Sequence, residues 1–162
     1  MEDIVRRVEY YYTKIPDRSG EGARILTGLK AAGVNLVAFS GFPTGVGRAQ
    51  LDFVPSNREA FLAAAQKAGL KLVGPKDAFL VQGKDRAGAL ADIFGKLGQA
   101  RISVTSVQAV ASSAGSYGAI LWVKPRKVRK AAQVLGVSLE LNNKHSILCA
   151  SRTTGDESLP TV

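Results

Sequence analysis

The chain has 162 residues, of which 46% are hydrophobic and 22% are charged, so it can bury a core and is not compositionally disordered. Lysine and arginine outnumber aspartate and glutamate by 22 to 13, and the resulting net charge of +9 is compatible with anionic partners. No run approaches the roughly 18 apolar residues of a membrane helix. The charged residues 1–7 lack the apolar core of a secretory signal, so we expect a cytoplasmic protein.

The single cysteine and the single histidine restrict the available chemistry. Cys149 alone excludes an intrachain disulfide, and together with His145 it excludes the common Cys/His zinc sites. Cys149 lies in an apolar run, where a buried, inert thiol is expected more often than a nucleophile. His145 has no evident nucleophile as a partner. We therefore expect no catalytic residue, no metal, no cofactor and no enzymatic activity.

The first part of the chain predicts a strand, a helix and a hairpin. A tyrosine-rich run over residues 9–14 favours a strand. A helix that ends at Gly33 follows, because apolar residues recur at helical spacing. The residues expected on its buried face are Ile25, Leu26, Leu29 and Ala32. Strands over 34–40 and 49–54 come next, separated by a glycine-rich loop over 41–47.

A second helix and a short strand complete this first unit. Ser56 begins a capping-box pattern with Glu59, which predicts the start of the helix, and Gly69 predicts its end. A strand is expected over residues 70–73.

The second part of the chain repeats this order. Its strands are expected over 79–82, 102–111, 117–123 and 137–141, and Pro125 suits the first turn of its second helix. The residues expected on the buried face of its first helix are Leu90, Ile93, Phe94, Leu97 and Ala100. Residues 144–149 resemble one more opening strand, which we interpret as an extra edge strand.

An internal repeat therefore organises the chain. Asp17-Arg18-Ser19-Gly20 recurs as Asp85-Arg86-Ala87-Gly88, and a repeat this long indicates two copies of a small domain. The predicted class is α+β, with two ferredoxin-like βαββαβ domains in tandem, antiparallel sheets and helices on one face. The predicted boundaries are 1–75 for the first domain, 76–150 for the second with its extra C-terminal strand, and 151–162 for a flexible tail.

The second copy resembles the opening of an ACT domain. Residues 79–94 contain a strand, a turn similar to D-R-P-G-A-L and an amphipathic helix, and residues 100–104 resemble the G-I-N start of strand two. The first copy carries a weaker version of the same pattern. Over residues 8–141 the chain is similar to a stand-alone tandem ACT protein. It departs from the family at four positions: Ser19 and Ala87 replace proline, Arg101 replaces glycine and Ser103 replaces asparagine.

The resemblance implies a regulatory module that binds a free amino acid at an interface between domains. Such a protein modulates assembly, an enzyme or a transcription partner, and we expect a homodimer. The unpaired amides at the start of a helix favour a carboxylate, and an asparagine side chain can accept from an ammonium group and donate to a carboxylate. The implied ligand-binding residues are Asp17, Ser19, Gly20, Glu21, Gly22 and Asn35 in the first copy, and Asp85, Ala87, Gly88, Ala89, Leu90 and Ser103 in the second.

Simpler interpretations stand beside this one. Gly20 and Gly88 can serve only as turn residues, and Asp17 and Asp85 can serve only as helix N-caps, each worth about 1 kcal/mol. A ligand site that has decayed would leave a protein-interaction module.

The alternative function is an RRM-like basic nucleic-acid-binding module, since RNA-recognition motifs share this element order. Their third-strand signature is matched at Tyr117, Gly118, Ile120 and Trp122. It fails at its basic first position and at Ala119, where a second stacking aromatic is needed. The basic cluster over residues 124–130 is interpreted as a solvated helix face, with a phosphate-binding stripe as the alternative. Neither nucleic acid nor a membrane is the expected partner.

Overall fold

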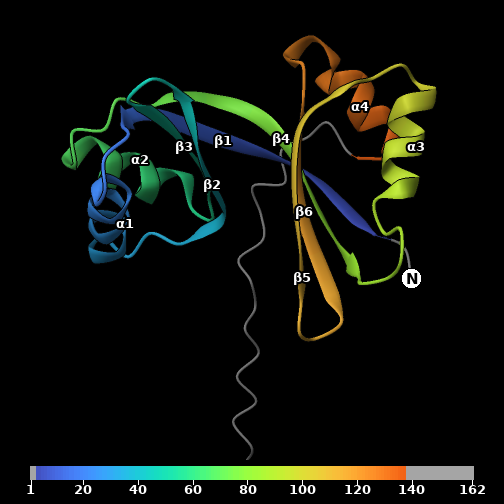
Figure 1. The fold of residues 1–162 in the computed structure, drawn as a ribbon, viewed down its shortest axis with the longest axis horizontal. Coiled ribbons are helices and arrows are strands. Elements are labelled where there is room, and N and C mark those ends of the chain that lie inside the picture. Colours follow the sequence, from blue (N-terminus) through green and yellow to red (C-terminus); the bar gives the residue numbers. More distant parts are fainter. Residues whose placement is uncertain (1–2, 138–162) are drawn as a thin grey trace, which may run out of the picture.

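The computed structural model describes residues 3–137, which form two α/β units around one sheet (Figure 1). The helices are α1 (Glu21–Ala31), α2 (Arg58–Lys67), α3 (Ala91–Gln99) and α4 (Val128–Val134), the last preceded by a 3₁₀ turn at Pro125–Lys127. The strands are β1 (Ile4–Pro16), β2 (Leu36–Gly45), β3 (Arg48–Pro55), β4 (Val73–Lys84), β5 (Val104–Ser112) and β6 (Ser116–Val123). The predicted strand over 144–149, His145, Cys149 and the tail over 151–162 lie outside the described residues, as does all of the strand predicted over 137–141 except its first residue.

All six strands belong to a single antiparallel sheet with the order β2-β3-β1-β4-β6-β5. Two sheets were expected, one for each copy, and the structure joins them. The sheet is curled, with α1 and α2 at one end of the molecule and α3 and α4 at the other (Figure 1). The fold is therefore α+β with βαββαβ repeated, as the sequence predicts.

Two long strands join the copies. The second part of β1, Tyr11 to Pro16, pairs with β3, whereas its first part pairs with β4. Strand β4 begins next to β1 and, from Phe79 onward, also pairs with β6. Strand β4 thus serves as the last strand of the first copy and the first strand of the second.

The strands predicted over 70–73 and 79–82 are consequently not two elements. Residues 70–72 are not part of a strand, and β4 runs without interruption from Val73 to Lys84 because β1 offers it a partner along most of this length. The beginning of β1 occupies the position of a fourth strand beside β4 in the second copy. The predicted boundary between residues 75 and 76 falls inside β4.

The helices cover one face of the sheet through two apolar cores. In the first copy Ile25 and Leu29 of α1 pack with Phe53 and Phe61, and in the second copy Ile93 and Leu97 of α3 pack in the other core. These four helix residues were predicted to be buried. Burial was also predicted for Phe94 and Ala32, and this was wrong. Phe94 is 39% exposed because it lies beside the side of α3 that packs on the sheet, and Ala32 is exposed.

The ends of α1 and α2 are as predicted, except that the N-cap of α2 lies one residue further along the chain. Gly33 and Gly69 adopt positive φ angles of 70° and 66° directly after α1 and α2, as expected for left-handed caps. The N-cap of α2 is Asn57 rather than Ser56, because the Asn57 side chain accepts a hydrogen bond of 2.9 Å from the Ala60 amide.

Candidate functional site

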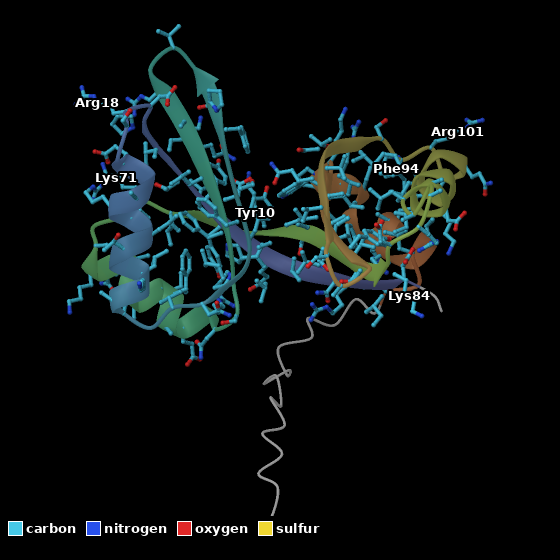
Figure 2. All side chains as sticks on the ribbon, turned by 60° about the horizontal axis from the view of Figure 1, so that its bottom comes forward. Tyr10, Arg18, Lys71, Lys84, Phe94 and Arg101 are labelled. Atoms are coloured by element: carbon cyan, nitrogen blue, oxygen red, sulfur yellow. The ribbon has the colours of Figure 1, made fainter. Side chains whose placement is uncertain are left out.

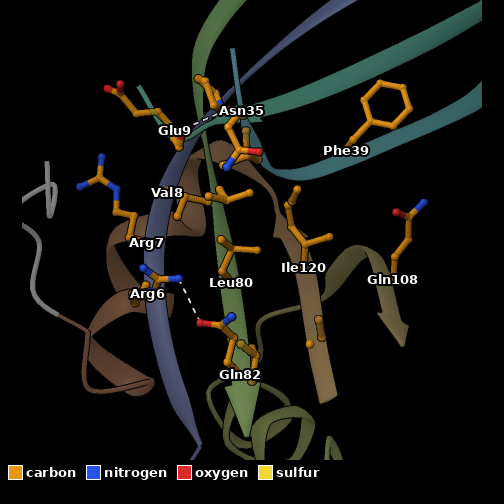
Figure 3. A pocket seen from close by; sticks show the side chains of 18 of the residues that line it. Arg6, Arg7, Val8, Glu9, Asn35, Phe39, Leu80, Gln82, Gln108 and Ile120 are labelled. Atoms are coloured by element: carbon orange, nitrogen blue, oxygen red, sulfur yellow. Dashed lines mark hydrogen bonds between the residues drawn. The ribbon is translucent and has the colours of Figure 1, made fainter. Parts of the chain in front are cut away.

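The face of the sheet that carries no helices forms a cleft between the two halves, which we call the inner cleft. Its volume is about 1180 Å³, and strands from both halves line it. The floor is apolar because alternate residues of the central strands point away from the helices. Val8, Leu80 and Ile120 form the middle of this floor (Figure 3).

One end of the inner cleft carries an arginine and two neutral amide side chains. The Arg6 guanidinium donates a hydrogen bond of 3.1 Å to Gln82 Oε1, and Gln108 lies on the opposite wall (Figure 3). Arg6 forms no ion pair within residues 3–137. This end can therefore receive a negatively charged or hydrogen-bonding group.

The other end of the inner cleft contains Asn35, one of the residues chosen from the sequence. Asn35 precedes β2, and its carbonyl accepts hydrogen bonds from the amide and the hydroxyl of Ser56 at 3.0 and 3.1 Å. Beside it, Arg58 Nη1 lies 3.5 Å from Glu9 Oε2. Glu9 lies on the face of β1 opposite Val8, so this ion pair lies at the rim of the inner cleft and not on its floor. A carboxylate and a guanidinium at one place are complementary to the ammonium and carboxylate of a zwitterion.

Tyr11 borders this end with its backbone, while its ring packs against Phe61 in the core beneath α1 and α2. Its side chain is only 2% exposed, and burial raises the pKa of Tyr11, so the phenol stays neutral and polar at physiological pH. Nothing in the sequence marked Glu9, Tyr11 or Arg58 as site residues, since Arg58 lies far along the chain from the other two and none of them belongs to a ligand-binding motif.

A second cavity lies at the turn that precedes α3. Its volume is about 300 Å³, and it brings together four residues predicted from the sequence: Asp85, Gly88, Ala89 and Leu90. Tyr117 and residues 109–111 form the opposite wall. The structure thus gathers most of the second copy's predicted residues at one place, while Ala87 is exposed.

The turn before α3 is held largely by its own groups. The amides of Ala89 and Ala91 donate to the carbonyls of Arg86 and Gly88 at 3.1 and 2.8 Å, so these two amides are already bonded. Arg86 also makes two hydrogen bonds of 2.9 Å to the carboxylate of Asp3, and these bonds hold the pKa of Asp3 below its usual value. No sequence motif predicted this contact between the residue before β1 and the turn.

The equivalent turn of the first copy lies beside the β2–β3 hairpin. The Asp17 amide donates to the Gly47 carbonyl at 3.0 Å, and Asp17, Ser19 and Gly20 are exposed. The N-cap of α1 is Gly20, with φ of 92°, and the N-cap of α3 is Leu90; neither cap makes a side-chain hydrogen bond. The interpretation of Asp17 and Asp85 as helix N-caps was therefore wrong.

Asn35 and the turn before α1 lie at opposite ends of that helix. Helix α1 has 11 residues, which corresponds to a length of about 16 Å. Glu21 and Gly22 at its first turn are therefore remote from Asn35 within one copy. Ser103, exposed at the start of β5, is separated from residues 85–90 by α3 in the same way.

The aromatic residues that suggested RNA binding are buried. Tyr117 is 6% exposed and lies in the core beneath α3 and α4, and Trp122 is 8% exposed. The Trp122 ring packs edge-on against Tyr10 on the inner face, with 6.1 Å between centroids. Neither ring can offer a free face to a base, so the stacking surface of an RNA-recognition motif is not formed by these residues.

The described part of the chain shows neither of two further kinds of feature, a membrane-spanning helix and a cluster of metal ligands. Among residues 3–137, no helix is long and apolar enough to cross a membrane. In the same residues, no group of three or more His, Cys, Asp or Glu side chains could hold a metal ion.

The fold is similar to that of known regulatory proteins. No protein-family model and no curated protein matches the sequence. Protein BT0572 from Bacteroides thetaiotaomicron superimposes with a TM-score of 0.69 at 16% identity, covering 83% of this chain and 88% of that one. The ligand-free regulatory subunit of aspartate kinase from Thermus thermophilus gives a TM-score of 0.57 at 17% identity, covering 84% and 95%.

The corresponding subunit from Thermus flavus gives the same TM-score of 0.57 at 16% identity. These likenesses extend over most of both chains and include both βαββαβ units. The chain therefore has the tandem, ACT-like fold of aspartate kinase regulatory subunits.

Proposed function

We propose that this protein binds a free α-amino acid and that binding modulates its assembly or the activity of a partner enzyme. The observation that carries the proposal is the group formed by Glu9, Arg58 and Asn35 at one end of the inner cleft. In this arrangement Glu9 accepts from the ligand's ammonium group, Arg58 binds its carboxylate, and the Asn35 side chain bonds to either one. The likeness to regulatory subunits supports a sensing role rather than a catalytic one.

We also propose that the protein is a homodimer in which the turns complete the ligand site. Asn35 and the turn before α1 cannot meet within one copy, so a second protomer has to supply one of them. The two edge strands of the sheet favour association, because neither β2 nor β5 contains a charged residue. Uncharged edges of this length are usually covered by another strand or element.

Isothermal titration calorimetry of the full chain against the twenty amino acids tests the binding proposal. We expect one amino acid or a small related group to bind at millimolar concentration or below, and Asn35→Ala to weaken that binding at least about 10-fold, the loss of about 1.4 kcal/mol. Ser103→Ala, at the equivalent position of the second copy, is the matched control and should change binding less than twofold. A folded protein that binds none of the twenty at millimolar concentration would contradict the proposal.

Light scattering of the same samples tests the regulatory step. If the ligand joins two protomers, it shifts the monomer–dimer equilibrium toward the dimer, because a ligand can only favour the state that binds it more tightly. Binding without any change in mass would restrict the proposal to modulation of a partner.

A further inference from the structure

The second half of the molecule carries a large excess of positive charge. Residues 93–139 contain no aspartate or glutamate, whereas they contain seven lysines and arginines. We call these residues the basic patch: Lys96, Arg101, Lys124, Arg126, Lys127, Arg129 and Lys130.

The fold brings the basic patch together at one end of the helix layer. Lys130 in the first turn of α4 donates a hydrogen bond of 2.8 Å to the carbonyl of Ala100, which is the C-cap of α3. The start of α4 therefore lies beside the end of α3, where Lys96 and Arg101 are located. Arg101 lies on the outer surface of this half, away from the inner cleft (Figure 2).

Few charges of the basic patch stabilise the fold: only Lys130 forms a hydrogen bond to the described residues, and only Lys96 lies in the last turn of an α-helix, where a cation is favourable. Within residues 3–137, none of the seven side chains forms an ion pair, whereas arginines elsewhere pair with Asp3, Glu9, Glu21 and Asp77. Arg129 and Lys130 lie in the first turn of α4, where the positive end of the helix dipole disfavours cations. The other members of the basic patch have no hydrogen-bonding or ion-pairing partner among residues 3–137, so they are available to an external anion.

The surroundings of the basic patch favour nucleic acid over other polyanions. The apolar sides of both helices are buried in the core, through Ile93, Leu97, Val128 and Ala131, so they cannot insert into a membrane surface. Phe94 is the only large hydrophobic side chain of α3 and α4 that is markedly exposed, and protein partners usually require a wider apolar centre.

We propose that the basic patch binds the phosphate backbone of double-stranded nucleic acid, without sequence readout. A duplex presents one negative charge per about 1.7 Å of its axis, so a compact group of cations meets several phosphates at once. This surface lies on the helix layer and does not involve Tyr117 or Trp122, whose buried rings exclude base stacking. The proposal is independent of amino-acid binding.

Fluorescence anisotropy with a labelled 24-base-pair DNA duplex of mixed sequence tests the proposal on the full chain. If all seven cations contact phosphates, the slope of log affinity against log salt approaches about −6. The triple variant Arg126→Gln, Lys127→Gln and Arg129→Gln should bind at least about 10-fold more weakly at 100 mM salt, and its slope should be smaller by about 2.7. These three side chains make no hydrogen bond or ion pair within residues 3–137, and unchanged Trp122 fluorescence will confirm folding.

The matched control removes the same charge from the first half. It combines Arg18→Gln, Lys30→Gln and Lys67→Gln, three positions at which the wild-type side chain is exposed. The affinity of this triple variant for the duplex should fall less than threefold. Equal weakening by both triple variants would mean that net charge, and not the basic patch, drives binding. The proposal is overturned by that result, by absence of wild-type binding at 50 mM salt, or by equally tight binding to anionic vesicles or polyglutamate.

Discussion

Replacing Phe79 with alanine tests whether the two copies fold as one unit. Phe79 is fully buried in the core beneath α3 and α4, and it lies on β4, which also pairs with β1. Removing a buried phenylalanine side chain costs about 3–5 kcal/mol through lost burial and the cavity that remains. With a urea dependence of about 2 kcal/mol per molar, the unfolding midpoint should fall by about 2 M.

The assay compares two signals during urea unfolding. Trp122, the only tryptophan, reports on the second copy, while far-ultraviolet circular dichroism reports on helices of both copies. Because β1 and β4 are shared, we expect the two curves to coincide and to shift together. Phe94→Ala, the same change at a partly exposed position on α3 of the same copy, should shift the midpoint by less than about 0.5 M. A circular dichroism transition that remains at the wild-type midpoint while fluorescence shifts would refute the shared architecture.

Two further predictions concern charge burial and backbone space. Asp52 is 5% exposed, and burial raises its pKa above the ordinary value of 3.8. Because the folded state disfavours the ionised carboxylate, Asp52 lowers the free energy of unfolding as pH rises above 3.8. Asp52→Asn should therefore raise the melting temperature at pH 7 but not near pH 3; an equal change at both would exclude this cause. Gly95→Ala should stabilise α3 by up to about 1 kcal/mol, since nothing lies within 4 Å of an added Cβ. Gly74→Ala should destabilise, because φ is +146° and its Cβ would lie 2.9 Å from the Tyr10 carbonyl; thermal melts that ranked the two glycine variants in the opposite order would contradict this reasoning.

Most of the local structure could be predicted from the sequence. The helical spacing of Ile25 and Leu29, and of Ile93 and Leu97, predicted which sides of α1 and α3 are buried. Glycines at 33 and 69 predicted where α1 and α2 end. These features depend on neighbouring residues and on intrinsic backbone preferences, which a single sequence expresses directly.

The candidate site was predictable only in part. A turn motif identified Asp85, Gly88, Ala89 and Leu90, which do line a cavity, and Ala87, which does not. The strand-two asparagine identified Asn35, which lines the inner cleft. Glu9 and Arg58 belong to no motif, and they meet only because β1 passes the start of α2. The contact of Asp3 with Arg86 is of the same kind, since antiparallel pairing brings the residue before β1 beside the turn that follows β4.

The sequence by itself determined that this protein contains βαββαβ twice, because periodicity and turn residues act over a few positions. Only the tertiary structure decided that the copies share one sheet, with the start of β1 beside β4 in the second copy and β4 passing through both. Strand pairing joins segments that are distant in the chain. How far a strand extends therefore depends on whether another strand lies beside it to accept and donate hydrogen bonds. The inner cleft exists because of that sharing, since the shared strands hold the two helix-free faces on either side of it.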